Sequence, residues 1–167
     1  VIATINEIRE NLSPDIPIVL GGYHATLKPR QSLLIPGVSA VVVGEGEHVF
    51  ENYLNELEKG SKDFSNVDGL CFKNPKGELI ENKRQVWMQY INQPPYPNYD
   101  LWDDIDSYFY CLGQLWLIGT RGCPFDWTNC EELYIRDSAP GRRFRFRDPK
   151  DYVAEIKFHY EKYKDRG

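Results

Sequence analysis

Two cysteines lie close together in a loop that also contains glycine and proline. Cys123 and Cys130 are separated by six residues, and Gly122 and Pro124 restrict the backbone around the first of them. Deprotonated cysteine is a soft ligand that suits iron, and a tight loop can direct two thiolates at one point. The same spacing also fits two free thiols in an ordinary loop. Cys123 and Cys130 are therefore candidate metal ligands whose assignment depends on their context.

A second group of candidates follows two short apolar runs near the N-terminus. Glycine loops without Cβ atoms let a large planar ligand approach the backbone closely. In open α/β sheets, ligands bind at the carboxyl ends of the strands, which is where these loops fall. The candidate cofactor contacts are Gly21, Gly22, His24, Gly44, Glu45 and Gly46. The alternative is that the glycines only turn the chain and that Glu47 caps a helix.

The elements that would position these loops alternate between helix and strand. Hydrophobic spacing predicts helices over residues 2–12, 29–35 and 48–59, and short buried strands over 17–20 and 40–43. Short connections between such elements are typical of a doubly wound α/β sheet, so the two strands should be parallel neighbours. A parallel sheet of two strands is marginal by itself, and the chain opens on Val1 rather than methionine. We therefore expect a fragment of a longer protein.

The remainder of the chain changes character. Residues 69–80 read as a β-hairpin that should pack as a separate unit, and residues 92–104 as a proline-rich extended linker. An apolar strand over 115–119 would lead into the cysteine loop. A final helix is predicted over 149–163. Its apolar face would consist of Tyr152, Val153, Ile156 and Tyr160.

Three pieces of the chain, in order, resemble consecutive parts of the cobalamin-binding radical S-adenosylmethionine enzymes. Residues 16–59 contain IVLGGYHAT and VVGEGE, which look like the later part of the cobalamin domain. Residues 67–100, with NQPPYPNYD, look like the joining hairpin and proline-rich segment. Residues 115–163 contain RGCPF and GRRFRFR, similar to the cluster loop of the radical barrel and the basic run after it. The order of the pieces makes the resemblance more specific than any one motif.

This resemblance implies the fold class and the cofactors. The expected fold is α/β: a partial Rossmann-like cobalamin-binding domain over 1–62, a hairpin and linker over 63–112, and the first β/α unit of a partial TIM barrel over 113–167. The implied cofactors are cobalamin, S-adenosylmethionine and a 4Fe-4S cluster, with Cys123 and Cys130 as cluster ligands. In this family the lower-ligand histidine, when present, lies in an earlier loop. His24 is therefore interpreted as a pocket or loop-stabilising residue.

The cysteine loop departs from the family pattern at one ligand. The family places three cysteines in this loop, and Trp127 stands at the middle position. An indole cannot ligate iron, because its nitrogen lone pair belongs to the ring and its N–H only donates. Asp126, one residue away, is a possible but harder substitute. We expect the chain to be a fragment of a radical enzyme that transfers methyl groups or rearranges carbon skeletons. The fragment alone should be inactive. The alternative is a non-catalytic cobalamin- or tetrapyrrole-binding module.

The composition argues against some classes of binding partner. The formal net charge of −5 argues against a broad nucleic-acid surface. The arginines of residues 141–147 should therefore line a polar face near the cysteine loop or pair with acids, while Phe144 and Phe146 pack inward as an edge strand. No apolar run is long enough for a membrane span. The few cysteines are typical of reduced cytoplasmic thiols, with Cys71 and Cys111 as small buried residues. His48 and His159 are interpreted as helix-surface positions. A small-molecule substrate is expected, of a kind this sequence does not define.

Overall fold

The computed structural model describes residues 1–92, 94–112 and 114–166, so Gln93 of the proline-rich segment lies outside the described residues. The chain divides into two compact units. Unit 1 comprises residues 1–88 and 125–143, and unit 2 comprises residues 89–124 and 144–167. Each is described by itself.

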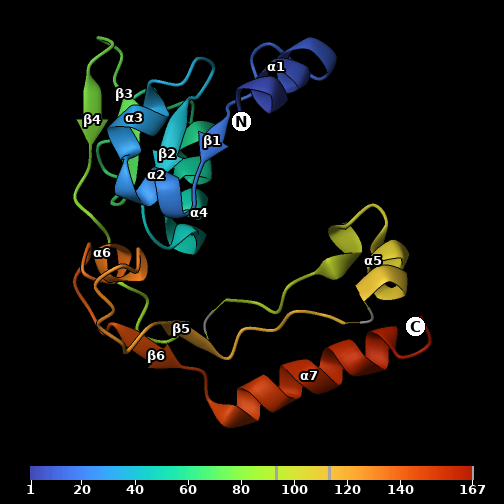
Figure 1. Cartoon of the computed structure of the whole chain (residues 1–167). Helices are drawn as coiled ribbons and strands as arrows, with labels where there is room; N and C mark the ends of the chain where they lie inside the picture. The colour runs from blue at the N-terminus through green and yellow to red at the C-terminus, as the bar shows by residue number, and fades with distance from the viewer. Residues whose placement is uncertain (93, 113, 167) are drawn as a thin grey trace. The chain divides into compact units, whose positions relative to one another are not determined.

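Unit 1 is built on a four-stranded mixed sheet in the order β1-β2-β3-β4 (Figure 1). Its strands are β1 (Val19–Leu20), β2 (Ala40–Val42), β3 (Leu70–Lys73) and β4 (Leu79–Glu81). The first two strands are parallel, as predicted, with Val19 opposite Ala40. The other pairs are antiparallel. The predicted hairpin exists, but it is wrong to treat it as a separate unit, because β3 pairs with β2 and extends the same sheet.

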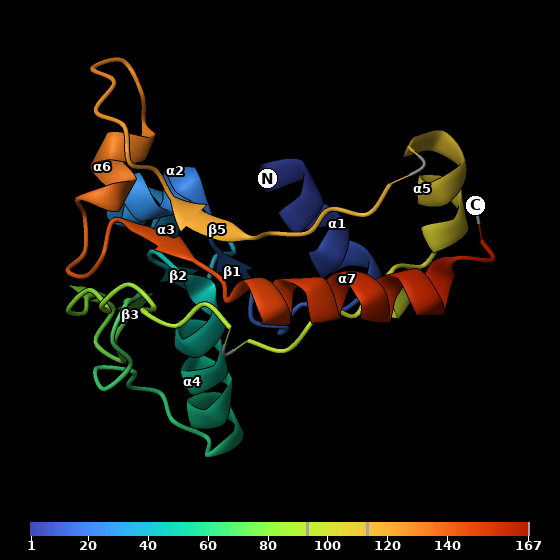
Figure 2. The same cartoon turned by 90° about the horizontal axis from the view of Figure 1, so that it is seen from below.

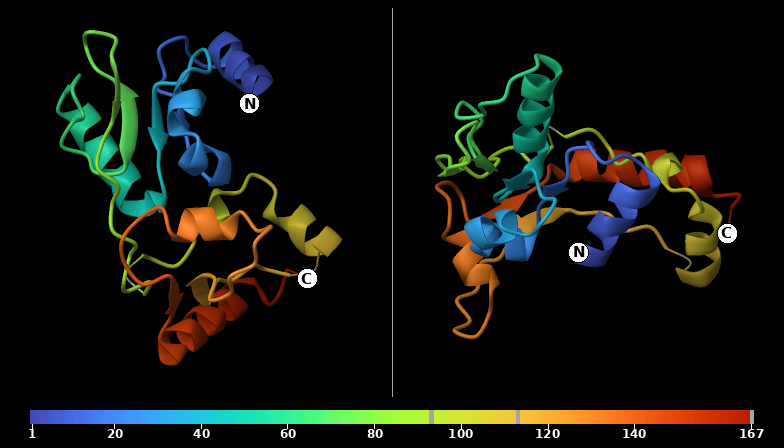
Figure 3. Two further views of the ribbon diagram at one scale, coloured as in Figure 1. Left: turned by 60° about the vertical axis from the view of Figure 1, so that its left-hand side comes forward. Right: turned by 90° about the horizontal axis from the view of Figure 1, so that it is seen from above.

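Helices cover both faces of this sheet. Those of unit 1 are α1 (Ile2–Asn11), α2 (Tyr23–Leu27), α3 (Pro29–Leu33), α4 (Gly46–Glu58) and α6 (Glu132–Arg136). Helices α2 and α3 lie on one face and α4 on the other (Figure 3, right). The three helices α1, α3 and α4 were predicted within two residues at every boundary. Helices α2 and α6 were not predicted, because a five-residue helix is too short to show a hydrophobic period.

The core of unit 1 alternates between the two faces of β2 and β3. Val41 and Cys71 pack with the residues of α1, α2 and α3, whereas Val42, Leu70 and Phe72 pack with α4. The parallel strands β1 and β2 are thus covered on both sides, as such strands normally are. Burial raises the pKa of the Cys71 thiol to about 11, so this cysteine is an inert part of the core.

Unit 2 contains a two-stranded antiparallel ladder and two longer helices (Figure 2). Its elements are a 3₁₀ turn at Tyr99–Leu101, α5 (Ile105–Leu112), β5 (Thr120–Gly122), β6 (Phe144–Phe146) and α7 (Pro149–Tyr163). The strand predicted over 115–119 is wrong: the paired residues begin at Thr120, where the chain meets β6. A strand needs a partner for its backbone groups, which apolar character alone does not supply.

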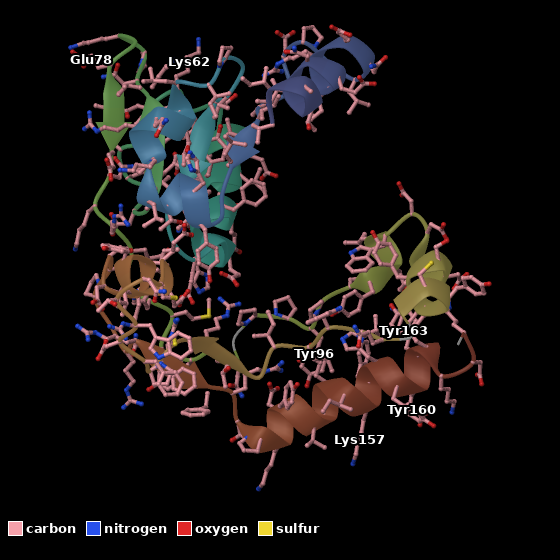
Figure 4. The ribbon with its side chains drawn as sticks, viewed as in Figure 1. Lys62, Glu78, Tyr96, Lys157, Tyr160 and Tyr163 are labelled. Carbon is pink, nitrogen blue, oxygen red and sulfur yellow. The ribbon has the colours of Figure 1, made fainter. Side chains whose placement is uncertain are left out.

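Helix α7 has the predicted bounds but buries a different face. Glu155, His159 and Tyr163 are buried, whereas Val153 and Ile156 of the predicted apolar face are exposed. The interpretation of His159 as a surface residue is therefore wrong. In Figure 4, Tyr96 and Tyr163 lie along one side of α7, and Lys157 and Tyr160 point away from it.

Charge pairing explains that choice of face. Arg147, just before α7, donates to the carboxylates of Asp151 and Glu155, and the side chain of Glu155 is 2 % exposed. Burying an arginine and a glutamate together is possible because each neutralises the other. Arg143 and Arg147 of this run thus pair with acids, as expected. The phenylalanines do not pack inward: Arg145 is buried between them, and Phe146 is exposed.

Candidate functional site

The loop after β1 offers open backbone. Gly22 has a φ of +88°, which favours glycine, and it immediately precedes α2. No described atom lies within 4 Å of where a Cβ would stand on Gly21 or Gly22. His24 is an exposed residue of α2. The first glycine pair therefore leaves room for a ligand against the main chain.

The loop after β2 makes several contacts with other residues of unit 1. The Gly44 amide donates to the Thr26 hydroxyl at 3.0 Å, and a Cβ on Gly44 would stand 3.2 Å from the Trp87 ring. The Glu45 carboxylate accepts a hydrogen bond from the Met88 amide at 2.8 Å. Glu45 thus helps to hold the segment around Trp87, and Gly44 leaves room for the Trp87 ring. This is a structural duty that the sequence did not indicate.

Gly21 and Gly46 meet at an apolar groove beside α4. The groove has a volume of about 670 Å³. It is lined by Ile16, Pro17, Val19, Leu20, Gly21, Val42, Gly46, Glu47, Phe50, Tyr53, Leu54 and Leu57. Of the six predicted contacts, these two glycines line the groove and the other four do not. The wall of the groove that α4 forms was not predicted from the sequence. The apolar stripe on α4 could have indicated it, because the stripe is wider than the sheet covers and leaves Phe50 43 % exposed.

The groove and the first glycine loop fit a planar cofactor such as a corrinoid. The glycine loop lies at the carboxyl end of the parallel pair β1 and β2, the usual ligand position in such sheets, and the groove reaches this end at Gly21 and Gly46. From there the groove extends along β1 to Ile16 and Pro17. The groove is within the size range of pockets that bury small molecules, and its walls are almost wholly apolar. Gly46 begins α4, so the free amides of that helix end lie beside the groove and could bind a polar or anionic group.

The cysteine loop spans the end of β5 and the start of α6. Cys123 directly follows β5, and Cys130 lies just before α6; both are partly buried. The Cys130 amide donates to the Trp127 carbonyl at 3.1 Å, forming a turn. The Trp127 side chain is 63 % exposed. Cys111 is exposed, contrary to expectation.

The nearest candidate for a third ligand is already engaged. Asp126 accepts a hydrogen bond from the guanidinium of Arg136 at 2.6 Å, and that arginine side chain is 3 % exposed. If Asp126 left Arg136 to bind a metal, the buried arginine cation would have fewer partners, which is costly. Within residues 1–92, 94–112 and 114–166, no group of three or more His, Cys, Asp or Glu side chains could hold a metal ion. The loop therefore does not fit a cluster that requires three protein thiolates.

Comparison with known proteins bears on both sites. Residues 1–54 match the B12 binding domain family. An uncharacterized methyltransferase of Pyrococcus horikoshii is 29 % identical over 161 residues, covering 95 % of this chain and 34 % of the relative. The anaerobic magnesium-protoporphyrin IX monomethyl ester cyclase of Rubrivivax gelatinosus is 30 % identical over 156 residues, covering 90 % and 27 %. The chain thus spans about a third or less of the length of these curated relatives.

Solved structures show the same family resemblance. The cobalamin-dependent S-adenosylmethionine radical enzyme OxsB superposes with a TM-score of 0.71 at 20 % identity, covering 99 % of this chain and 21 % of OxsB. The chain has the fold of the cobalamin-dependent radical S-adenosylmethionine enzymes. The radical S-adenosylmethionine methyltransferase TsrM from Kitasatospora setae gives 0.69 at 22 % identity, covering 96 % and 30 %. The family resemblance and the α/β fold class expected from the sequence are confirmed. The roles of the individual site residues and the three domain boundaries stay predictions.

No helix in the described part of the chain is long and apolar enough to cross a membrane.

Proposed function

We propose that this chain binds a cobalamin at the carboxyl end of its parallel strands, as the cobalamin-binding part of a radical S-adenosylmethionine enzyme. The observation that carries the proposal is a coincidence of two findings. The B12 binding domain match covers residues 1–54, and the apolar groove with its two glycine loops is formed largely by the same residues. Gly21 and Gly22 would lie against the ligand, and the walls of the groove would exclude water from its apolar parts.

The chemistry would come from the cofactor. A bound cobalamin supplies a cobalt centre that can carry a methyl group, and methyl transfer or carbon-skeleton rearrangement is the class of reaction we propose for the whole enzyme. The residues of this chain would bind and orient the corrin ring. Gly44 and Glu45 do not line the groove, and their hydrogen bonds hold Thr26 and Met88. Their predicted contact with the cofactor stays a prediction.

Equilibrium dialysis of the 167-residue chain against hydroxocobalamin tests the proposal. We expect saturable binding with one equivalent per chain, and a shift in the visible absorption of the bound cofactor. No retention of cobalamin above a denatured control would contradict it.

A second candidate is a module that binds cobalamin without cluster chemistry. Trp127 favours it, because Cys123 and Cys130 alone are one thiolate short of the family's ligand set. Anaerobic reconstitution with iron and sulfide separates the candidates. If only the ligand is missing, Trp127→Cys should bind several-fold more iron than the parent chain. Equal and low iron in both would favour the second candidate, and equal and high iron would mean that another residue supplies the ligand.

A further inference from the structure

Arg136 is the most heavily engaged buried side chain near the cysteine loop. Its guanidinium donates to the Phe125 carbonyl at 3.0 Å, to the Asp126 carboxylate at 2.6 Å and to Asp137 at 3.1 Å. These partners lie on both sides of Cys130 in the sequence. The hydrogen bonds that Arg136 donates to Asp137 first, and to Asp126 second, raise the pKa of Arg136 above its usual value. The arginine is therefore a permanent cation with two acceptors on the segment that leads to Cys130.

The same residue is tied to the sheet through its backbone. The Trp87 indole N–H donates to the Arg136 carbonyl at 3.0 Å, and the Trp87 amide donates to the Pro140 carbonyl at 2.9 Å. The Trp87 ring in turn packs against Gly44 in the loop after β2. A second attachment joins α6 to α2, where the Tyr23 hydroxyl donates to Glu132 at 2.7 Å. Figure 2 shows α6 beside α2.

The chain thus offers a way to order the loop that needs no metal. In a loop held by three thiolates, the cluster itself would fix the backbone around the ligands. This loop has two cysteines and an exposed tryptophan at the middle position. A buried arginine, by contrast, requires its acceptors to stay in place, because an unpaired buried charge is costly. Its planar fork also fixes the direction of each acceptor, which a lysine cannot do.

The structure assigns to Arg136 the part of a positioning residue: it holds residues Phe125 and Asp126 of the cysteine loop against the rest of unit 1 without iron, and Trp87 anchors Arg136 to the loop after β2. Asp126 is then the acceptor of this arginine and not a replacement ligand. The assignment concerns the loop alone, so it does not depend on cobalamin binding.

The cysteines of the chain allow a direct test by alkylation. We would follow the reaction of each thiol with iodoacetamide at pH 8, by mass spectrometry of the digested chain. Exposed Cys111 gives the rate of an accessible thiol, and buried Cys71 reports unfolding of the core. Cys130 reports the loop. In the parent chain we expect Cys130 to react several-fold more slowly than Cys111, with or without the iron chelator dipyridyl. Acceleration of Cys130 by dipyridyl would overturn the proposal, because metal would then be holding the loop.

Two substitutions test the arginine itself. Arg136→Lys keeps the charge but loses the fork, and it should accelerate Cys130 about five-fold while Cys71 stays protected, which is the signature of local opening. Arg143→Lys is the matched control, because Arg143 also pairs with Asp137 but is largely exposed; it should leave Cys130 unchanged. An unchanged Cys130 rate in Arg136→Lys would contradict the assignment.

If Arg136→Lys exposes Cys71 as well, the chain has lost its core, and Trp87→Phe decides. That substitution keeps an aromatic ring near Gly44 and removes the hydrogen bond to the Arg136 carbonyl. We expect about a two-fold acceleration at Cys130 with Cys71 protected, in keeping with the loss of one hydrogen bond. No acceleration, or equal acceleration of both thiols, would overturn the proposal.

Discussion

The two units fill their interiors in different ways. In unit 1, β2 and β3 bury apolar side chains on both faces, including Val41, Val42 and Phe72. In unit 2, the buried side of α7 carries Glu155 and His159 together with Tyr163. The first interior is stabilised chiefly by removal of apolar surface from water, which depends little on pH. The second depends on charges and hydrogen-bonding groups that must be satisfied. The comparison predicts that the units respond differently to substitution and to pH.

The largest expected effect is in the apolar interior. Phe72 is fully buried and packs edge-on against Phe64, with ring centroids 5.4 Å apart. Phe72→Ala should lower the free energy of unfolding by about 4 kcal/mol, through lost burial and the cavity that remains. Urea denaturation followed by circular dichroism measures this. Phe125→Ala, at an exposed position of unit 1, is the matched control and should change stability by less than about 1 kcal/mol. Similar losses in the two variants would mean that the sheet core is not what stabilises unit 1.

The next effect concerns the ion pair of unit 2. Glu155→Gln removes one partner of the buried Arg147 and should cost about 3 kcal/mol, because the remaining charge is poorly compensated. Asp151→Asn changes the other, more exposed carboxylate that Arg147 contacts and should cost less. Thermal unfolding of both variants, monitored by near-ultraviolet circular dichroism, gives the comparison. A larger loss for Asp151→Asn would place the important pair at the surface and weaken the contrast between the units.

The smallest effect is a dependence on pH. His159 lies among Tyr99, Phe158 and Tyr163, and neither ring nitrogen has a hydrogen-bond partner in the described part of the chain. Burial, with a smaller contribution from Lys162, lowers the pKa of His159 below 6.5. The unfolded chain therefore takes up this proton first as the pH falls, and stability should decrease from about pH 6.5 downward.

His159→Leu should abolish that decrease and change stability at pH 7 by less than about 1 kcal/mol, because it replaces an unsatisfied ring with an apolar group. Glu155, 3.7 Å from the ring, opposes this effect by favouring the charged form of His159. The aspartates with lowered pKa, such as Asp100 and Asp137, act only below about pH 4, so their contribution is separable. Stability that stays flat from pH 7 to pH 5 in the parent chain would contradict the effect of burial on His159.

The same contrast explains what could be predicted from the sequence. The runs at 17–20 and 40–43 and the hairpin at 69–80 have patterns that match strands covered by helices, and the structure places strands there. The buried face of α7 could not be predicted, because Arg147, which selects Glu155 for burial, lies outside the helix and no periodicity records it. The groove was likewise hidden, since an apolar stripe on α4 reads as core whether or not the sheet covers all of it.

The candidate site divides along similar lines. Gly21 and Gly46 were predictable as loop glycines after strands, and both line the groove. Glu45 was predicted beside them, but its carboxylate serves Met88, a residue 43 positions later. The duty of Arg136 was also invisible in the sequence, because its acceptors become neighbours only when the loop folds back on α6.

The most direct test of the central claim is whether cobalamin occupies the groove beside α4. Gly46 is the first residue of that helix and has ordinary space for a side chain, so Gly46→Leu should fold and fill the groove. Asn55→Leu adds the same side chain to an exposed position of α4 outside the groove. Hydroxocobalamin dialysis should show at least about ten-fold weaker binding for Gly46→Leu, equivalent to about 1.4 kcal/mol, and unchanged binding for Asn55→Leu. Equal affinity of the two variants would contradict the placement of the cofactor in this groove.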